Sequence, residues 1–483
     1  MSERIEHRAD ALFALPDLPR RATLLGDLPG WRRDLEERRI ELVDRGADVV
    51  VADAAHEREA LALGRPAVVV DGPRDAARRL RSSGLAVTRL LPIPVTGSPV
   101  VYADLGRRRA ARYGIERVIV HPERWRTLRN RAAGLAILAG LPLPAERLVT
   151  LGHRLGAPAL LAAGRQLGLD PAAGWVMVVS KGSIVRRNAL FVFRGGRPEH
   201  VVKFGRVPGL VEAFEREERG FRLAAEAGDV VTRHATRYGG RFALGELHAS
   251  VESAALGTKL AALLRRPGSR DAKLAAVEPI ARWLVDVACQ TARPPETLAA
   301  QRSHYAREVV PFWAGEGAPA RLVEALAQVP AAFQHNDMAE ENLVLDGDDF
   351  RALDWEWANP TGLPLGDLVY FAVHILRLVD GAASDEPTVR DGHFARLLTG
   401  EAPSSPVLFR WVTDAVRALE LPAEVVGPMV TLSWLERGRI SKIERHRAEA
   451  VGGEPLELPF GERAAKLWLT HPGLGAGWNA WRR

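Results

Sequence analysis

The feature that most constrains this chain of 483 residues is a change of sequence pattern near Gly174. From there to about residue 256, short apolar runs alternate with turns that contain glycine, a pattern typical of antiparallel strands. Beyond that point the sequence is mostly helical. The sequence therefore predicts a small β-rich lobe over 174–256, followed by a large helical lobe over 257–483.

Five runs in the β-rich segment are expected to be strands, and a helix is expected between the third and the fourth. The expected strands are 175–179, 188–193, 200–204, 241–247 and 249–254, and the expected helix covers about 211–227.

The first ~115 residues follow another pattern, in which continuous Val and Leu runs alternate with charged helical stretches. Such runs indicate a parallel sheet that is covered on both faces. We expect a small Rossmann-like α/β domain of unknown role over 1–115, and a helical connector over 116–173. The turn after the first run lacks G-x-G-x-x-G, which argues against a dinucleotide site. The expected strands are 22–25, 48–52, 66–71 and 85–91.

Composition excludes several classes of protein. The formal net charge is +6, but no basic stripe with interleaved aromatic residues appears, so no nucleic-acid partner is expected. No run of about 18 apolar residues exists, so no membrane span is expected. The polar N-terminal residues predict no signal peptide, which favours a cytoplasmic protein. The single cysteine, Cys289, cannot form a disulfide within the chain.

The strongest chemical signal is the segment His335–Asn342, which reads HNDMAEEN. Asp337 lies five residues before Asn342, and Asp354 lies twelve residues after it. Short apolar runs between Asn342 and Asp354 predict a hairpin, which places these two side chains on adjacent arms. Two hard oxygen ligands so placed can hold Mg²⁺ against nucleotide phosphates. A carboxylate just upstream can accept the proton of an attacking hydroxyl.

These residues, in this order, resemble the aminoglycoside phosphotransferase and choline kinase family. That family carries His-Gly-Asp-x-x-x-x-Asn, then Ile-Asp-Trp-Glu or a similar sequence, then an Asp-Leu pair that opens a helix. The corresponding residues here are His335, Asp337, Asn342, Asp354-Trp355-Glu356 and Asp367-Leu368. The resemblance covers roughly 174–483 and implies a bilobal, kinase-like α+β fold. One departure is Asn336 in place of the usual Gly. Asn is a small polar residue that tolerates a positive φ angle, so the backbone conformation expected at this position is still accessible.

The resemblance also implies roles for these residues. Asp337 would be the catalytic base, and Asn342 and Asp354 would be ligands of Mg²⁺. Asp367 would orient the catalytic loop together with His335. Glu356 would contact the metal through water or would be a surface acid, and both interpretations stay open.

ATP is expected to bind the β-rich lobe. The resemblance implies that Lys203, at the centre of an apolar strand, contacts phosphate, with Glu217 or else Glu218 of the next helix as its ion-pair partner. The turn Ser180-Lys181-Gly182-Ser183 would cover the phosphates through Gly182 and Ser183, and backbone groups of 252–254 would contact the adenine.

The sequence thus predicts an ATP-dependent and Mg²⁺-dependent phosphotransferase that acts on a hydroxyl group of a small molecule, such as a sugar, an aminoglycoside or an amino alcohol. The alternative is a catalytically silent kinase-like binding module. A protein kinase is disfavoured, because Asp-Trp-Glu replaces Asp-Phe-Gly. The acidic pair Glu340 and Glu341 would suit a cationic acceptor, and a solvated loop explains the pair equally well.

Overall fold

The computed structural model of the protein describes residues 8–72, 76–93, 100–118, 124–141, 148–154, 156–180, 186–384, 386–450 and 458–482. The chain divides into two compact units. The first comprises Met1–Glu215 and Arg237–Ala254, and the second comprises Arg216–Thr236 and Ala255–Arg483.

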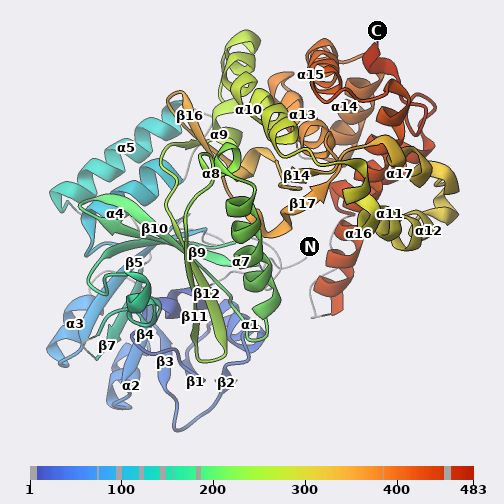
Figure 1. The fold of residues 1–483 in the computed structure, drawn as a ribbon. Helices are drawn as coiled ribbons and strands as arrows, with labels where there is room; N and C mark the ends of the chain where they lie inside the picture. Colours follow the sequence, from blue (N-terminus) through green and yellow to red (C-terminus); the bar gives the residue numbers. More distant parts are fainter. Residues whose placement is uncertain are drawn as a thin grey trace. The chain divides into compact units, whose positions relative to one another are not determined.

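The first unit is built on one sheet of twelve strands, counted over the described residues (Figure 1). The order across the sheet is β11-β12-β10-β9-β8-β6-β5-β7-β4-β3-β1-β2. The strands are β1 (Arg21–Leu25), β2 (Glu41–Leu42), β3 (Val49–Asp53), β4 (Ala67–Gly72), β5 (Ala86–Ile93), β6 (Val101–Asp104), β7 (Leu148–His153), β8 (Gly174–Val178), β9 (Asn188–Arg194), β10 (Arg197–Phe204), β11 (Tyr238–Leu244) and β12 (Leu247–Ser253).

The five strands expected after Gly174 are present as β8 to β12, and each pairs antiparallel with its neighbour in the sheet. Helix α7 (Val211–Glu226) separates β10 from β11, as predicted. The alternation of apolar residues with glycine turns therefore predicted these strands, but it did not predict that β12 lies between β10 and β11.

The parallel sheet expected near the N-terminus is only partly correct. Strands β1, β3 and β4 are parallel neighbours, but β7 lies between β4 and β5 and is antiparallel to both. The prediction of a wholly parallel sheet is therefore wrong, and so is the purely helical connector over 116–173, which contains β7. All six residues of β7 are buried, so its apolar run is a central strand of the sheet.

Strand β6 pairs antiparallel with β8, with Tyr102 opposite Met177, and this pairing joins the two halves of the sheet. The boundaries predicted at residues 115 and 173 therefore fall inside one compact unit.

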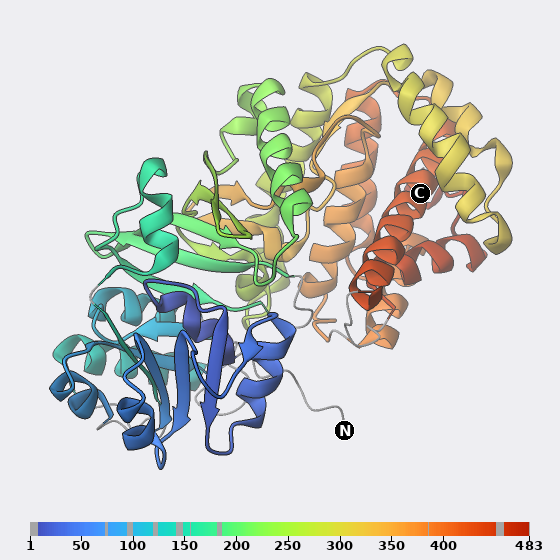
Figure 2. The same cartoon turned by 90° about the horizontal axis from the view of Figure 1, so that it is seen from below.

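Alternating residues of the strands face two separate helical layers. Val49 and Val51 contribute to a core with η1, α1 and α6, whereas Val50 and Ala52 pack with α2 and α3. Figure 2 shows the blue helices beside the blue strands of this part. The helical segments of the first unit, apart from α7, are η1 (Arg8–Ala14), α1 (Pro29–Glu37), α2 (Glu57–Ala62), α3 (Ala76–Ser82), α4 (Arg108–Tyr113), η2 (Gly114–Val118), α5 (Arg124–Ala139), α6 (Ala159–Ala163) and η3 (Gly164–Leu167).

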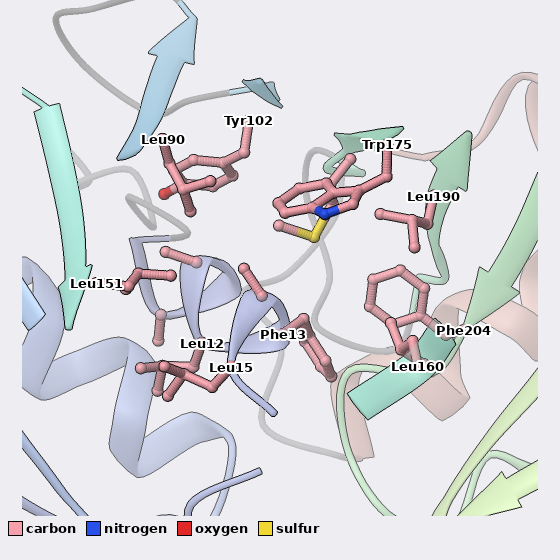
Figure 3. Packing of buried hydrophobic residues seen from close by; sticks show 14 of the residues in the cluster. Leu12, Phe13, Leu15, Leu90, Tyr102, Leu151, Leu160, Trp175, Leu190 and Phe204 are labelled. Atoms are coloured by element: carbon pink, nitrogen blue, oxygen red, sulfur yellow. The ribbon is translucent and has the colours of Figure 1, made fainter. Parts of the chain in front are cut away.

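The larger core of the first unit draws on both halves of the sheet. Figure 3 shows Leu12 and Phe13 of η1 close to side chains from strands of both halves, among them Tyr102 and Trp175. The rings of Phe13 and Phe204 meet edge to face with their centroids 4.6 Å apart. The N-terminal segment is thus part of the same core as the β-rich lobe.

The second unit is mainly helical and contains two small sheets, β13-β15-β16 and β14-β17. No helix in the described part of the chain is long and apolar enough to cross a membrane. The strands are β13 (Thr258–Lys259), β14 (Ala332–Gln334), β15 (Leu343–Asp346), β16 (Asp349–Ala352) and β17 (Asn359–Gly362). The α-helices are α8 (Asp229–Thr232), α9 (Leu260–Leu264), α10 (Arg270–Gln290), α11 (Ala299–His304), α12 (Val310–Phe312), α13 (Gly366–Val379), α14 (Pro387–Thr399), α15 (Ser405–Ala418), α16 (Ala423–Ala450) and α17 (Phe460–Thr470).

Candidate active site

The β15–β16 hairpin brings Asn342 and Asp354 to the same end of two paired strands. Leu343 is opposite Ala352 in the antiparallel register, and one step further out the Leu353 N–H donates to the Asn342 carbonyl at 2.8 Å. Asp354 follows directly, in the left-handed region with φ 65°. Two residues separated by twelve positions in sequence therefore lie side by side, as the spacing predicted.

Aromatic packing holds the hairpin in place. The ring of Phe350, on β16, stacks on that of His234 with the centroids 3.9 Å apart and an angle of 3° between the planes. Trp283 of α10 meets both rings edge to face. The backbone N–H of Ala352 also donates to the His234 carbonyl at 2.7 Å.

Asn342 is oriented by Asp337. The Asn342 Nδ2 donates to the Asp337 carboxylate at 2.8 Å and to the Asp337 carbonyl at 2.9 Å. Both partners are acceptors, so the amide nitrogen must face them, and the amide oxygen faces the other way. That oxygen is the group that a hard cation would use.

Asp337 also binds two residues that the sequence pattern did not indicate. Arg437 of α16 forms an ion pair with its carboxylate, and the hydroxyl of Tyr370 donates to it at 3.2 Å. Arg437 further donates to the Asn336 carbonyl at 3.0 Å and to the Tyr370 hydroxyl at 2.7 Å. Tyr370 could have been found from sequence, since it lies three residues after Asp367 on one helix. Arg437 stands in no motif and is about 100 residues away from Asp337 in sequence.

His335 supports the loop from beneath as a neutral imidazole. Its Nδ1 accepts from the Asp337 N–H at 3.2 Å, and its Nε2 donates to the Leu353 carbonyl at 2.9 Å. Burial lowers the pKa of His335, which agrees with one donor and one acceptor nitrogen. The ring therefore connects the loop of Asp337 to the hairpin arm that leads to Asp354.

Asp367, the second residue of α13, holds the backbone of the same loop. Its carboxylate accepts from the N–H groups of His335 at 2.5 Å and of Asn336 at 2.7 Å. Asn336 has φ 64°, so the residue in the place of the family's Gly adopts the left-handed conformation expected of it. Its side chain donates to the Trp357 carbonyl at 2.9 Å.

The two glutamates of the loop, Glu340 and Glu341, both pair with basic side chains. Glu340 is buried and pairs with His374 at 2.9 Å and Arg377 at 3.2 Å. Burial by itself raises the pKa of Glu340, but the His374 hydrogen bond and the nearby charges outweigh it and bring the pKa to about 2. Glu341 is exposed and pairs with Arg265 at 3.0 Å.

Glu356, for which two interpretations were open, lies 3.6 Å from Arg216 in an ion pair. The Arg216 guanidinium also lies over the ring of Trp357, 4.9 Å from its centroid. The Glu356 side chain is 16% exposed, so it is not a surface acid, and its contact with a metal through water stays a prediction.

In the first unit, Lys203 has a carboxylate partner on the neighbouring strand. Its Nζ lies 3.2 Å from Glu252 Oε1, and both side chains are largely buried. The predicted pairing with Glu217 joins different units and stays a prediction. Glu217 is buried and Glu218 is half-buried, which favours Glu217 as the inward-facing residue.

The other residues predicted to contact a nucleotide are described only in part. Gly182 and Ser183, predicted to cover the phosphates, lie outside the described residues. At the predicted adenine position, the N–H of Ser253 donates to the Arg237 carbonyl and that of Ala254 to the Glu199 carbonyl, both at 2.8 Å. These two donors are therefore taken, and contact of this segment with an adenine base stays a prediction.

The donor set fits Mg²⁺ held jointly with a nucleotide. No group of three or more His, Cys, Asp or Glu residues in the described ranges could hold a metal by itself. Mg²⁺ commonly takes one or two protein oxygen ligands and completes its shell with phosphates and water. The Asn342 amide oxygen and the Asp354 carboxylate would supply those protein ligands.

No protein-family model matches this sequence, and no curated protein matches it. Among solved structures, the chain is similar to a Ralstonia eutropha JMP134 protein described as an aminoglycoside phosphotransferase, at 15% identity with a TM-score of 0.41, covering 67% of this chain and 97% of that one. It is also similar to glucosamine kinase in complex with glucosamine, ADP and inorganic phosphate, at 18% identity, 68% and 86% coverage and a TM-score of 0.36.

A third similar structure is the macrolide 2'-phosphotransferase MphH from Brachybacterium faecium, at 16% identity, 55% and 97% coverage and a TM-score of 0.32. The chain is thus similar to small-molecule phosphotransferases. These TM-scores are too low to decide its function, which has to be inferred from the residues of the site.

Proposed function

We propose that this protein is an ATP-dependent and Mg²⁺-dependent phosphotransferase that transfers the γ-phosphate to a hydroxyl group of a small molecule. The observation that carries the proposal is the arrangement of Asp337, Asn342 and Asp354. Asn342 donates to Asp337 through its amide nitrogen and lies beside Asp354 at the open end of a hairpin. A proton acceptor and two metal ligands are thereby assembled in one loop and hairpin.

Asp337 is the group that would accept the proton of the acceptor hydroxyl. One oxygen of its carboxylate binds Arg437 and Tyr370, and the other accepts from Asn342. A carboxylate oxygen can accept two hydrogen bonds, so the oxygen bound by Asn342 can still receive one from a substrate. Arg437 holds the carboxylate in one orientation, which suits a base.

The metal and the nucleotide would be held by the groups already described. Asn342 and Asp354 would bind Mg²⁺, and Lys203 would contact the phosphates. Mg²⁺ bound to ATP neutralises the charge that develops on the phosphate oxygens.

The ion pairs of Glu340 and Glu341 indicate which kind of acceptor these residues would favour. Neither carboxylate is left without a basic partner, because Glu340 binds His374 and Arg377 and Glu341 binds Arg265. These residues therefore give no support for a cationic acceptor, and the proposal extends to neutral hydroxyl compounds such as sugars.

The test is a screen of hydroxyl acceptors with ATP and Mg²⁺, in which ADP formation and phosphorylated product are both measured. Asp337→Asn keeps the size of the side chain but removes the base, so we expect turnover to fall by about 100-fold or more. Asp348→Asn, in the exposed turn at the other end of the hairpin, is the matched control and should keep wild-type turnover.

Two results would contradict the proposal. One is wild-type turnover in Asp337→Asn with a good acceptor. The other is a thermal shift on addition of Mg-ATP with no transfer to any acceptor in the screen, which would support the silent binding module instead.

A further inference from the structure

Helix α5 (Arg124–Ala139) has a clearly defined inner face. Ile137 is buried in a cluster with Ala111 and Ile115. Gly134 approaches η2 so closely that a Cβ atom there would lie 2.3 Å from Glu116 Oε1. The helix therefore packs on α4 and η2 through Gly134 and Ile137, and its opposite side faces away from the protein.

That opposite side is apolar. Trp125, Leu128 and Leu135 are 59%, 63% and 58% exposed, and Leu141 just beyond the helix is 60% exposed. In the described part of the chain these are the four most exposed large hydrophobic side chains. Trp125, Leu128 and Leu135 follow helical spacing and share one face with exposed alanines at positions 132 and 139.

All charged residues of α5 are positive. Its sequence has four arginines, at positions 124, 126, 129 and 131, and no Asp or Glu. At about 100° per residue, Arg129 and Arg131 fall on the two sides of the apolar stripe, and both are exposed. The Arg126 and Arg129 guanidinium groups also lie over the Trp125 ring, 5.4 and 5.3 Å from its centroid.

We propose that α5 binds the surface of a membrane that contains anionic lipids, with the stripe of Trp125, Leu128 and Leu135 inserted among the headgroups. An apolar face with Trp and Leu, flanked by arginines, is the arrangement of helices that lie in a membrane interface. The arginine stems can extend along the apolar layer while the guanidinium groups reach lipid phosphates. This surface is independent of the proposed phosphotransfer and would bring the enzyme to a membrane.

The charge argues against a second copy of this chain as the occupant. Two α5 helices packed through the same face would bring their arginines together, with no acidic residue on either helix to compensate. A membrane surface has an anionic headgroup layer above an apolar interior. It therefore matches both the arginines and the apolar stripe of this face.

The test is co-sedimentation of the full-length protein with vesicles of phosphatidylcholine alone, or of phosphatidylcholine with added phosphatidylglycerol. We expect binding to the anionic vesicles and little to the neutral ones. The double variant Arg129→Gln/Arg131→Gln should bind about 30-fold more weakly, from about five-fold per arginine. Leu128→Ser/Leu135→Ser should bind about ten-fold more weakly or worse.

Matched controls carry the same substitutions elsewhere. Leu63→Ser changes an exposed leucine just after the end of α2. Arg417→Gln changes an exposed arginine on α15, and both variants should bind like the wild type. Circular dichroism of each variant checks that the fold is retained. The proposal is overturned if the wild type does not sediment with anionic vesicles or if the α5 variants bind normally. It is also overturned if the leucine variant abolishes a self-association of the protein while vesicle binding is absent.

Discussion

Asp367 illustrates how one buried carboxylate can fix the backbone of a loop. It accepts from two consecutive N–H groups, those of His335 and Asn336, and its own N–H donates to the Gln334 side chain at 2.7 Å. Burial raises the pKa of Asp367 to about 7, although the two backbone hydrogen bonds lower it. The loop beneath Asp337 therefore rests on a carboxyl group that titrates near neutral pH.

This shift predicts how stability depends on pH. In the unfolded chain the Asp367 carboxyl ionises near pH 4. Between about pH 4 and about pH 7 the folded protein keeps a proton that the unfolded chain has lost, so stability falls as pH rises. The contribution is at most about 1.4 kcal/mol per pH unit. In Asp367→Asn it should be absent, and one orphaned N–H should cost about 1–3 kcal/mol at every pH.

Urea unfolding across that range measures this difference. The free energy of unfolding of the wild type relative to Asp367→Asn should decrease steadily as pH rises. Asp348→Asn, which changes an exposed carboxylate, should follow the wild-type slope. Parallel pH profiles for the wild type and Asp367→Asn would contradict the assignment.

The residues of the site divide into those that the sequence could indicate and those that it could not. Asp337, Asn342 and Asp354 stand at short spacings within one loop and hairpin, so a sequence pattern can indicate them. Arg437 cannot be indicated in this way, because it reaches Asp337 through the packing of α16, and no local spacing records that contact.

At the scale of elements, helix α7 controls the position of the turn that carries Asp354. A Cβ atom at Gly220 would lie 1.8 Å from the Trp355 carbonyl oxygen. Trp355 is fully buried, and its ring meets His335 edge to face at 4.5 Å. The glycine is needed for this close approach, since any side chain would push against the backbone next to Asp354.

Gly220→Ala therefore tests whether the contact matters for the site. Replacing a helix-interior glycine by alanine ordinarily stabilises by up to about 1 kcal/mol. Here we expect the opposite: a lower melting temperature, and a turnover loss larger than the stability loss explains, because the Asp354 turn must move.

The matched control is Gly392→Ala, inside α14, where a Cβ atom would meet nothing within 4 Å. It should raise the melting temperature and leave turnover unchanged. If Gly220→Ala behaves like Gly392→Ala, the close approach of α7 to the turn does not affect turnover, and the prediction is wrong.

The sequence predicted those strands whose boundaries are marked by turns close to them in the chain. The strands β8 to β12 alternate with glycine turns, so their presence could be predicted along the chain, although the place of β12 between β10 and β11 could not. Strand β7 was not predicted, because its partners β4 and β5 both precede it by more than fifty residues in sequence. The apolar sequence of its six buried residues does not indicate whether β7 runs parallel or antiparallel to β4 and β5.

At the scale of the whole first unit, a buried charge cluster connects the N-terminal segment to the β-rich half of the sheet. Asp10 of η1 is fully buried and pairs with Arg38 and with Arg206, the latter at 2.8 Å. It also accepts from the Asn188 side chain at 2.7 Å. Asn188 and Arg206 in turn hold the backbone of Ser180, through its N–H and its carbonyl.

This cluster explains why a separable domain over 1–115 was a mistaken expectation. Asp10 is 178 residues from Asn188 and 196 from Arg206, separations that no sequence pattern can reveal. Together with the β6–β8 pairing, it makes the N-terminal part a structural component of the lobe that carries Lys203. The role of the first ~115 residues is thus at least partly to complete that lobe.

Asp10→Asn should therefore destabilise the whole unit and not only the N-terminal segment. The substitution removes the buried carboxylate that both Arg38 and Arg206 bind, and breaking such a buried pair typically costs about 3–5 kcal/mol. Asp17→Asn, an exposed neighbour in the same segment, should change stability by no more than about 0.5 kcal/mol. Urea unfolding followed by tryptophan fluorescence measures both, since Trp31 and Trp175 lie in the shared core. A separate early transition in Asp10→Asn that disappears when Trp31 is also replaced by Phe would instead mean that the N-terminal part unfolds independently of the lobe.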